Sequence, residues 1–193
     1  MLAEGLNVTI YERKSEVGGL WNSCDAIFPT NAYDNLETNL PRHLMTFSGQ
    51  PWRTSTPIFP GRDDVAGYLQ SLAGDLLTKH PNGIKLRRRR EVISLRHVSQ
   101  DSGLVGWEIS ARNREMDVIN REGDMITYEA DEFDLVVVSN GIYTKEFTPT
   151  SYEGIQDWRV KYGGTESHVK TFRNTSNFQG KVCDHVLRSG IGS

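Results

Sequence analysis

The sequence predicts an α/β fold that combines a partial Rossmann-like domain, of the three-layer ββα kind, with a β-meander. Three observations support this prediction. The strand pattern of residues 7–11 is followed by the acidic Glu12 and the glycine pair Gly18-Gly19. A long helical pattern begins near Asp63. Short alternating segments come next, and the last is a continuous apolar run over residues 133–139, which is typical of a strand buried on both faces.

The strand at residues 7–11 has the pattern of the second strand of a dinucleotide-binding βαβ unit. A carboxylate at the end of such a strand, here Glu12, accepts hydrogen bonds from ribose hydroxyls. The Gly-x-Gly-x-x-Gly turn that precedes it by about 20 residues in such units is not in this sequence. Gly190-x-Gly192 begins a second turn of this kind, and the chain ends at the next residue. We therefore expect an incomplete chain that lacks the phosphate-binding part of both nucleotide sites.

The helix is expected to have Asp63 or Asp64 as its N-cap and to end before the turn signal Pro81-Asn82-Gly83. Its apolar residues recur at helical spacing: Val65, Tyr68, Leu69, Leu72, Leu76 and Leu77. Residues 22–60 show little periodicity and hold five aromatic residues, so we expect an ordered, irregular segment with a functional role.

The part of the chain after the helix predicts a series of strands. They cover residues 84–89, 91–98, 107–112, 116–120, 125–130 and 133–139. The three before the last are short, alternating and separated by polar turns, which indicates a meander. The chain is thereby divided into a partial nucleotide-binding domain over residues 1–150 and, over residues 151–193, a linker with the start of a second such domain.

The composition is that of a soluble protein with one domain or a large part of one. Its 193 residues carry a net charge of −3, which indicates no particular partner. Cys24 and Cys183 lie far apart without a metal or redox spacing, so we expect neither a disulfide framework nor a metal site. No apolar stretch reaches the ~20 residues that span a bilayer, and the N-terminus has no signal-peptide pattern. We expect a cytoplasmic protein.

Four consecutive arginines, residues 87–90, allow two interpretations. One is a nuclear-localisation or nucleic-acid-binding patch, and the other is a solvated strand and turn of an α/β domain. The run is isolated, the net charge is negative, and no nucleic-acid-binding motif accompanies it. We therefore favour the solvated strand and turn, and we expect no nucleic-acid partner.

The first segment carries candidate binding residues, each a weak signal by itself. A strand-end glutamate is often a surface charge, a Gly-Gly pair is commonly a simple turn, and Trp21 fits a core position better than a cofactor contact. Their order strengthens the signal. Gly18 and Gly19 have no Cβ and let the backbone approach a phosphate or a ring closely.

Together these residues resemble the flavin-containing monooxygenases, and the resemblance covers nearly the whole chain. Val-Thr-Ile-Tyr-Glu-Arg at residues 8–13, with Gly-Gly-Leu-Trp at residues 18–21, is similar to the family's adenosine-binding strand and the loop on the isoalloxazine side. Residues 33–42, which include Leu-Glu-Thr-Asn, resemble its Leu-x-Thr-Asn segment. Residues 133–143 resemble the strand and turn that close the FAD domain.

The most specific match is Tyr162-x-Gly164-x-x-x-His168-x-x-x-Phe172. It resembles the family fingerprint Phe-x-Gly-x-x-x-His-x-x-x-Tyr/Phe, with tyrosine at the first position. Phe172 followed by Arg173 is closer to the heteroatom-oxidising branch than to the ketone-oxidising branch, which usually has tryptophan there.

The resemblance implies a monooxygenase that uses FAD, NADPH and dioxygen to oxygenate a small amine or sulfide. Residues 1–150 then belong to the FAD-binding domain, and the NADP-binding domain begins within residues 151–193. The asparagine that matches Asn39 lies beside the flavin in the family and helps to protect its oxygen adduct, so Asn39 is the candidate catalytic residue. The candidate cofactor-binding residues are Glu12, Arg13, Gly18, Gly19, Leu20, Trp21, Thr38, Asn39, Leu40, Asn140, Gly141, Gly190 and Gly192.

Two departures from the family pattern keep alternatives open. The missing first glycine turn, and the charged Asp184 and Arg188 before Gly190, favour a non-catalytic remnant or interaction module of the same family. Another FAD/NAD(P)H oxidoreductase, such as a disulfide reductase, needs a Cys-x-x-Cys or Cys-x-x-x-x-Cys motif, and neither occurs. Because the turn that holds the FAD pyrophosphate is not in the sequence, we expect the purified 193-residue chain not to retain FAD at near-stoichiometric occupancy.

Overall fold

The computed structural model describes residues 5–25, 27–99, 105–115, 128–141, 154–163 and 167–180. Its elements are, in chain order, β1 (Val8–Tyr11), η2 (Gly19–Trp21), η3 (Arg42–Leu44), α1 (Arg62–Lys79), β2 (Ile84–Arg87), β3 (Arg90–Ser99), β4 (Val105–Asn113), β5 (Tyr128–Phe133), α2 (Ile155–Tyr162), η5 (Val169–Thr171) and η6 (Ser176–Phe178). No helix in this part of the chain has the length and apolar character that crossing a bilayer requires.

β1 and β2 form a parallel pair, in which Val8 lies opposite Ile84 and Tyr11 lies opposite Arg87. Parallel neighbours require a long crossover connection, usually a helix. Here the crossover contains α1, which contacts β2. The structure thus contains a βαβ unit, and the sequence analysis did not foresee that the segment after the helix pairs with β1.

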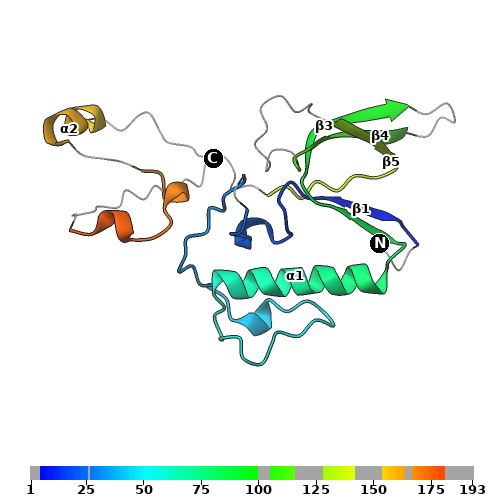
Figure 1. Cartoon of the computed structure of the whole chain (residues 1–193), viewed down its shortest axis with the longest axis horizontal. Helices are drawn as coiled ribbons and strands as arrows, with labels where there is room; N and C mark the ends of the chain where they lie inside the picture. Colours follow the sequence, from blue (N-terminus) through cyan, green and yellow to red (C-terminus); the bar gives the residue numbers. More distant parts are fainter. Residues whose placement is uncertain are drawn as a thin grey trace, which may run out of the picture.

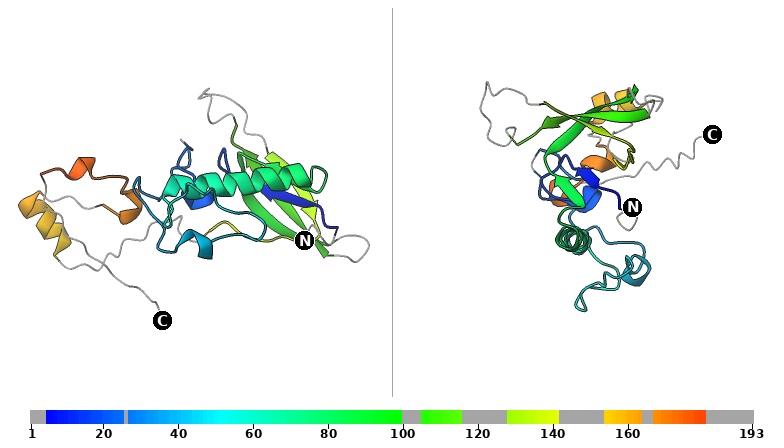
Figure 2. Two further views of the ribbon diagram at one scale, coloured as in Figure 1. Left: turned by 90° about the horizontal axis from the view of Figure 1, so that it is seen from below. Right: turned by 90° about the vertical axis from the view of Figure 1, so that its right-hand side faces the viewer.

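α1 and the two sheets lie in three layers (Figure 1). α1 lies on one side of the β1–β2 pair, and the antiparallel sheet β3–β4–β5 lies on the other; both views of Figure 2 agree with this order. β1 also contacts β3, so the two sheets meet at the ends of their strands. The mixture of helices with parallel and antiparallel strands confirms the α/β class, whereas the Rossmann-like assignment and the boundary near residue 150 remain predictions.

α1 begins at Arg62 with Gly61 as its N-cap, so the prediction that Asp63 or Asp64 is the cap was wrong. The Asp64 carboxylate accepts a hydrogen bond from the Gly61 N–H at 3.1 Å. Asp64 therefore occupies the third helical position, where an acidic side chain reaches back to the cap. The predicted end before Pro81 is confirmed, since Lys79 is the last helical residue.

Tyr68 anchors the irregular segment before α1 to the helix. Its ring is 7% exposed and stacks on Trp52 with 3.9 Å between the ring centroids. Its hydroxyl donates to the Gln50 carbonyl at 2.7 Å and accepts from the Phe47 N–H at 2.9 Å. Within its described residues, the segment 22–60 contains only the 3-10 turn η3 and an isolated bridge from Glu37 to Gly61, so the predicted irregular structure is confirmed.

The antiparallel sheet has β4 at its centre. Leu95 of β3 lies opposite Ile109, and Ile109 lies opposite Asp131 of β5. Ile109 and Ala111, both on β4, are buried. The central strand therefore supplies the apolar side chains that this small sheet buries.

Most of the predicted strands agree with the structure to within a few residues. The predictions for residues 84–89, 91–98 and 107–112 correspond to β2, β3 and β4. The one for residues 125–130 overlaps β5, which is described over Tyr128–Phe133 and so continues three residues further than predicted; residues 125–127 lie outside the described residues. Residues 116–120 lie outside the described residues.

The strand predicted over residues 133–139 was wrong. Phe133 ends β5, and the residues after it have no regular structure. Leu135, Val137 and Val138 are 62–68% exposed. No strand in the described part of the chain pairs with this run, so its backbone has no ladder to join and its apolar side chains have no layer to cover them.

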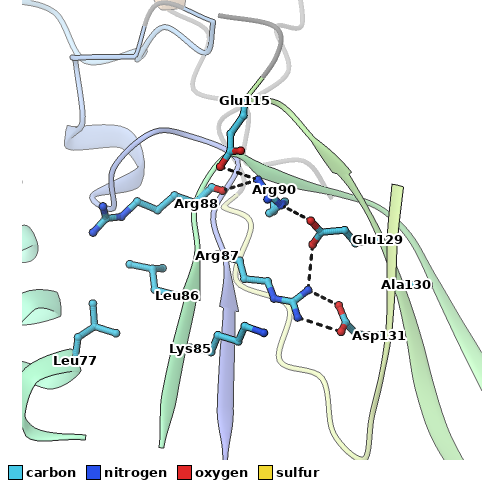
Figure 3. A pocket seen from close by; sticks show the side chains of 10 residues that line it. All are labelled: Leu77, Lys85, Leu86, Arg87, Arg88, Arg90, Glu115, Glu129, Ala130 and Asp131. Atoms are coloured by element: carbon cyan, nitrogen blue, oxygen red, sulfur yellow. Dashed lines mark hydrogen bonds and ion pairs between the residues drawn. The ribbon is translucent and has the colours of Figure 1, made fainter. Parts of the chain in front are cut away.

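The arginine run joins the two sheets through ion pairs (Figure 3). The Arg87 guanidinium contacts Asp131 at 2.5 Å and Glu129 at 3.1 Å, and Arg90 contacts Glu129 at 2.8 Å. Tyr11 of β1 donates its hydroxyl to Asp131 at 2.5 Å. The two arginines and the two carboxylates stand at one side of an open hollow of about 840 Å³ between β2, the end of α1 and β5.

The interpretation of the run as a solvated strand and turn was therefore wrong for Arg87 and Arg90, whose side chains are only 18% and 16% exposed. Carboxylates on β5 compensate their charge, which is why they tolerate partial burial. Arg88 fits the interpretation better: it is 46% exposed and pairs with Glu16 at 3.3 Å. Arg89 forms the turn with a left-handed φ of 52°.

We predict that Arg87→Met lowers the free energy of unfolding by about 2 kcal/mol, because it leaves the half-buried Asp131 carboxylate without its ion-pair partner and Glu129 with Arg90 alone. Urea denaturation followed by circular dichroism measures the loss. Arg88→Met is the matched control. It removes an exposed ion pair, which contributes less than about 0.5 kcal/mol. Equal losses in the two variants would contradict the prediction.

Candidate functional site

Glu12 stands directly after β1, as the sequence analysis placed it. Its backbone continues the β1–β2 pairing, because its N–H donates to the Arg87 carbonyl at 2.9 Å. One carboxylate oxygen, Oε1, accepts from the Lys14 N–H at 2.8 Å. The other oxygen accepts nothing from the described residues. An ionised carboxylate has about four lone-pair sites, so Glu12 retains capacity for a ligand.

Gly18 and Gly19 form the turn into η2 with backbone angles that favour glycine. Their φ values are 123° and 51°. The Trp21 N–H closes the turn on the Gly18 carbonyl at 2.9 Å. A Cβ on Gly19 would meet no heavy atom within 4 Å, so the space beside this residue is open to a ligand. The left-handed backbone explains the glycine pair, and the open space allows a flat group to approach it.

Lys14 connects Glu12 to the glycine turn, and the sequence analysis missed it. The residue is 5% exposed, and its Nζ donates to the carbonyls of Gly19 at 3.0 Å and Asn22 at 2.9 Å. Burial lowers the pKa of the ammonium because it removes water from the charged form, and the nearby carboxylates of Glu12 and Asp25 counteract only part of this shift.

Asp25 fixes the other end of the same loop. Its buried carboxylate accepts hydrogen bonds from the N–H groups of Ser15 at 2.7 Å, Phe28 at 2.8 Å and Ile27 at 3.0 Å. Burial by itself would raise the pKa of the Asp25 carboxyl. The three N–H donors outweigh this effect and hold the pKa below its usual value. Arg89 adds a positive charge 4.0 Å away.

The glycine turn is linked to the start of α1. The Thr30 hydroxyl donates to the Leu20 carbonyl, and its oxygen accepts from the Ala32 N–H at 3.1 Å. The Ala32 carbonyl in turn accepts from Arg62, the first residue of α1, at 3.5 Å. In addition, η2 itself contacts α1 (Figure 1).

The Thr38-Asn39-Leu40 segment is held at the same end of α1. The Thr38 N–H donates to the Pro60 carbonyl at 3.0 Å, and the buried Thr38 hydroxyl donates to the Leu40 carbonyl at 2.8 Å. Asn39 is exposed, and its side chain has no hydrogen bond to the described residues. The turn thus fixes Asn39 by its neighbours and leaves its amide free for a ligand.

The fingerprint segment docks on residues 33–34. The Phe172 ring meets the Tyr33 ring at 5.7 Å, edge to face, and the Asp34 N–H donates to the Arg173 carbonyl at 2.8 Å. His168 is the N-cap of η5, and its Nδ1 accepts from the Lys170 N–H at 3.1 Å. The fingerprint histidine is therefore used to shape its own segment.

The remaining predicted site residues are not joined to this group. Asn140 and Gly141 are exposed and follow the irregular run after β5. The Arg13 guanidinium lies over the Phe28 ring at 4.8 Å. Gly190 and Gly192, like Gly164 of the fingerprint, lie outside the described residues. No group of His, Cys, Asp and Glu suited to a metal ion occurs among the residues that the structure describes.

Comparison with known families decides what this arrangement belongs to. The profile of the flavin-binding monooxygenase-like family matches residues 1–193. The chain belongs to the flavin-binding monooxygenase-like family. The resemblance to flavin-containing monooxygenases is thereby confirmed, and membership of this family implies a flavin cofactor.

Curated relatives of this flavin-binding monooxygenase-like chain include monooxygenases from fungi, plants and animals. The thiol-specific monooxygenase of Saccharomyces cerevisiae is 27% identical over 187 residues, which cover 96% of this chain and 38% of the relative. The flavin-containing monooxygenase FMO GS-OX-like 6 of Arabidopsis thaliana is 28% identical, over 98% of this chain and 40% of the relative. Flavin-containing monooxygenase 5 of Mus musculus is 27% identical, over 100% of this chain and 32% of the relative. The chain thus spans at most about two fifths of the length of these relatives.

The sequence analysis found the two turns but missed the polar residues that hold them. Lys14 and Asp25 lie in a stretch of mixed charge, where lysine and aspartate are usually solvated. One signal was available. Only five residues separate Glu12 from Gly18, and in so short a loop a lysine side chain can donate hydrogen bonds to the backbone carbonyls of the turn.

We predict that Asp25→Asn lowers the free energy of unfolding at neutral pH by about 1–3 kcal/mol, because the charged acceptor of three N–H donors is lost. The pKa of Asp25 is lower in the folded chain than in the unfolded chain. Its contribution to stability is therefore present above the unfolded pKa of about 4 and is lost as the pH falls through the folded pKa.

Urea denaturation between about pH 7 and about pH 2 measures both effects. The variant should lose less stability than the wild type over the acid part of this range. Asp75→Asn, on the exposed side of α1, is the control and should leave the acid dependence unchanged. An unaltered acid dependence in Asp25→Asn would contradict the assignment.

Proposed function

We propose that this chain is the flavin-contacting part of a flavin-dependent monooxygenase that uses FAD, NADPH and dioxygen to oxygenate a nitrogen or sulfur nucleophile. The observation that carries the proposal is the pairing of an underused strand-end carboxylate, Glu12, with an open left-handed glycine turn at Gly18-Gly19. Lys14 holds the two together. Membership of the flavin-binding monooxygenase-like family supports the choice of ligand.

The residues present fit a flavin nucleotide in two respects. The free lone pairs of Glu12 suit a vicinal diol such as ribose. The open face of Gly19 suits the edge of a flat ring, with Leu20 and Trp21 beside it. Leu20, in the middle of η2, is 39% exposed and so presents an apolar surface to such a ring. We assign the ribose to Glu12 and the ring to the turn.

The second group of contacts in the proposal is the Thr38-Asn39-Leu40 turn. Its hydrogen bonds to Pro60 and within the turn make it rigid, and the exposed Asn39 amide can both donate and accept. We assign Asn39 to the flavin and the nicotinamide side. Asn140 and Gly141 remain candidates for the same cofactor.

When bound, the flavin supplies the redox chemistry, accepting a hydride from NADPH and reacting with dioxygen. The residues of this chain supply binding, orientation and exclusion of water. Glu12 binds the ribose, and the glycine turn and Asn39 orient the flavin ring. Exposed apolar residues such as Leu20 and Leu40 exclude water from the ring when the cofactor covers them. Among the residues that the structure describes, the site includes no paired acid and base, and the proposed reaction requires none from the protein.

The test of cofactor binding is a titration of the 193-residue chain with FAD, up to about 1 mM, followed by the flavin fluorescence. We expect a saturable change of low affinity, so that the chain binds added FAD in the titration but does not retain it at near-stoichiometric occupancy through purification. Glu12→Gln should weaken binding about tenfold, because it removes the charge that strengthens hydrogen bonds from ribose. Glu16→Gln is the matched control, since its carboxylate pairs with the exposed Arg88 instead.

Absence of saturable binding by the wild type would overturn the proposal for this chain. Equal affinities of wild type and Glu12→Gln would overturn the role of Glu12. For the reaction, NADPH oxidation by the natural protein that carries this chain should yield an oxygenated product with an amine or a sulfide. Oxidation that yields only reduced acceptors would assign the protein to the reductases.

A further inference from the structure

Lys14 is a buried cation at a place where the chain has no ordinary need for one. It lies in the short loop between Glu12 and Gly18 and is 5% exposed. Lysine is almost never fully buried unless it is paired, since removing water from an ammonium is unfavourable. Among the described residues, no carboxylate lies within ion-pair distance of its Nζ. Backbone carbonyls are its acceptors instead.

Lys14 makes four hydrogen bonds that meet at the site. Its Nζ donates to the carbonyls of Gly19, the first residue of η2, and of Asn22, its C-cap. Its N–H donates to the Glu12 carboxylate, and its carbonyl accepts from the Arg89 N–H at 3.1 Å. One residue therefore connects the end of β1, the proposed ribose acceptor, the glycine turn and the arginine turn.

The direction of the Gly19 carbonyl fixes the direction of the peptide that follows. A trans peptide is planar, with its C=O and N–H on opposite sides. When the Gly19 carbonyl is drawn toward the Lys14 ammonium, the N–H of Leu20 is directed away from it. That N–H has no acceptor among the described residues, and the Gly19 carbonyl accepts otherwise only from the Asn22 N–H, at a longer 3.4 Å. Among the described contacts, the Lys14 ammonium at 3.0 Å is therefore the closer one that holds this peptide in one orientation.

We infer that Lys14 is a positioning residue for the flavin: its buried ammonium holds the Gly18–Trp21 turn in the conformation that receives the ring. This inference rests on the proposed function, which places the turn against the flavin. The inference accounts for the burial of the Lys14 ammonium. Charge-assisted bonds to carbonyls are stronger than neutral ones, and in a water-poor setting they rigidify the turn.

The test compares Lys14→Met, which keeps the length of the side chain and removes the donors, with two controls. Lys79→Met removes an exposed lysine at the end of α1. Ile109→Ala weakens the core of the β3–β4–β5 sheet, so that it reports the effect of lower global stability without a change at the turn. If circular dichroism shows Lys14→Met to be unfolded, Lys14→Gln takes its place, since it retains a neutral donor.

Amide hydrogen exchange, followed by NMR, gives a readout that needs no flavin. The Trp21 and Asn22 N–H groups donate to the carbonyls of Gly18 and Gly19 within the turn. We expect them to exchange at least about tenfold faster in the Lys14 variant than in the wild type or in either control. Equal rates in the Lys14 variant and in Ile109→Ala would overturn the inference, because the effect would then be one of global stability.

The flavin arm measures the dissociation constant of FAD in the same variants. We expect about a tenfold weakening for the Lys14 variant, and less than about twofold for both controls. Faster exchange at the turn with unchanged FAD affinity would overturn the inference, because the turn would then not be the flavin contact. If the wild type binds no FAD, the proposed function fails, and the exchange rates still decide whether Lys14 holds the turn.

Discussion

Three backbone hydrogen bonds at the ends of β1 and β2 hold the described structure together. The Glu12 N–H donates to the Arg87 carbonyl, and the Arg90 N–H donates back to the Glu12 carbonyl, both at 2.9 Å. The Arg89 N–H reaches the Lys14 carbonyl at 3.1 Å. These bonds end the parallel pair and turn the chain into β3. On one side of this junction, arginine side chains point toward the carboxylates of β5, and on the other side the loop of the site begins. The ion pairs with β5 and the loop therefore depend on the same three bonds.

The site is organised by polar burial more than by an apolar core. The buried polar side chains that the structure describes are Lys14, Asn22, Asp25, Thr30 and Thr38, and all of them lie in the loops of the site. Each holds backbone groups of a turn. Hydrogen bonds have direction, whereas apolar contacts have little, so this arrangement specifies the orientation of peptides as well as the position of side chains. A ligand that contacts backbone groups requires such a defined orientation of the peptides.

The sequence predicted regular elements well wherever a local periodicity defined them, as for α1, β2 and β3. It failed where the outcome depends on partners far away in the chain. The apolar run after Phe133 reads as a buried strand, but a strand needs neighbours, and none is described beside it. The arginine run predicts solvated side chains, but the carboxylates that compensate the charge of the partly buried Arg87 lie about 40 residues later in the chain. For the site, motif order located both turns, while Lys14 and Asp25 are recognised only from their burial.

Arg89 links the junction to the site loop. Its φ of 52° is one that glycine adopts freely and other residues adopt at a penalty. The turn is thus locally frustrated. Its backbone conformation favours glycine, whereas the contact with the buried Asp25 at 4.0 Å requires the side chain of an arginine. A relative with glycine here would relax the backbone and lose that cation. A single residue thus joins the backbone geometry of the junction to the charge of the site loop.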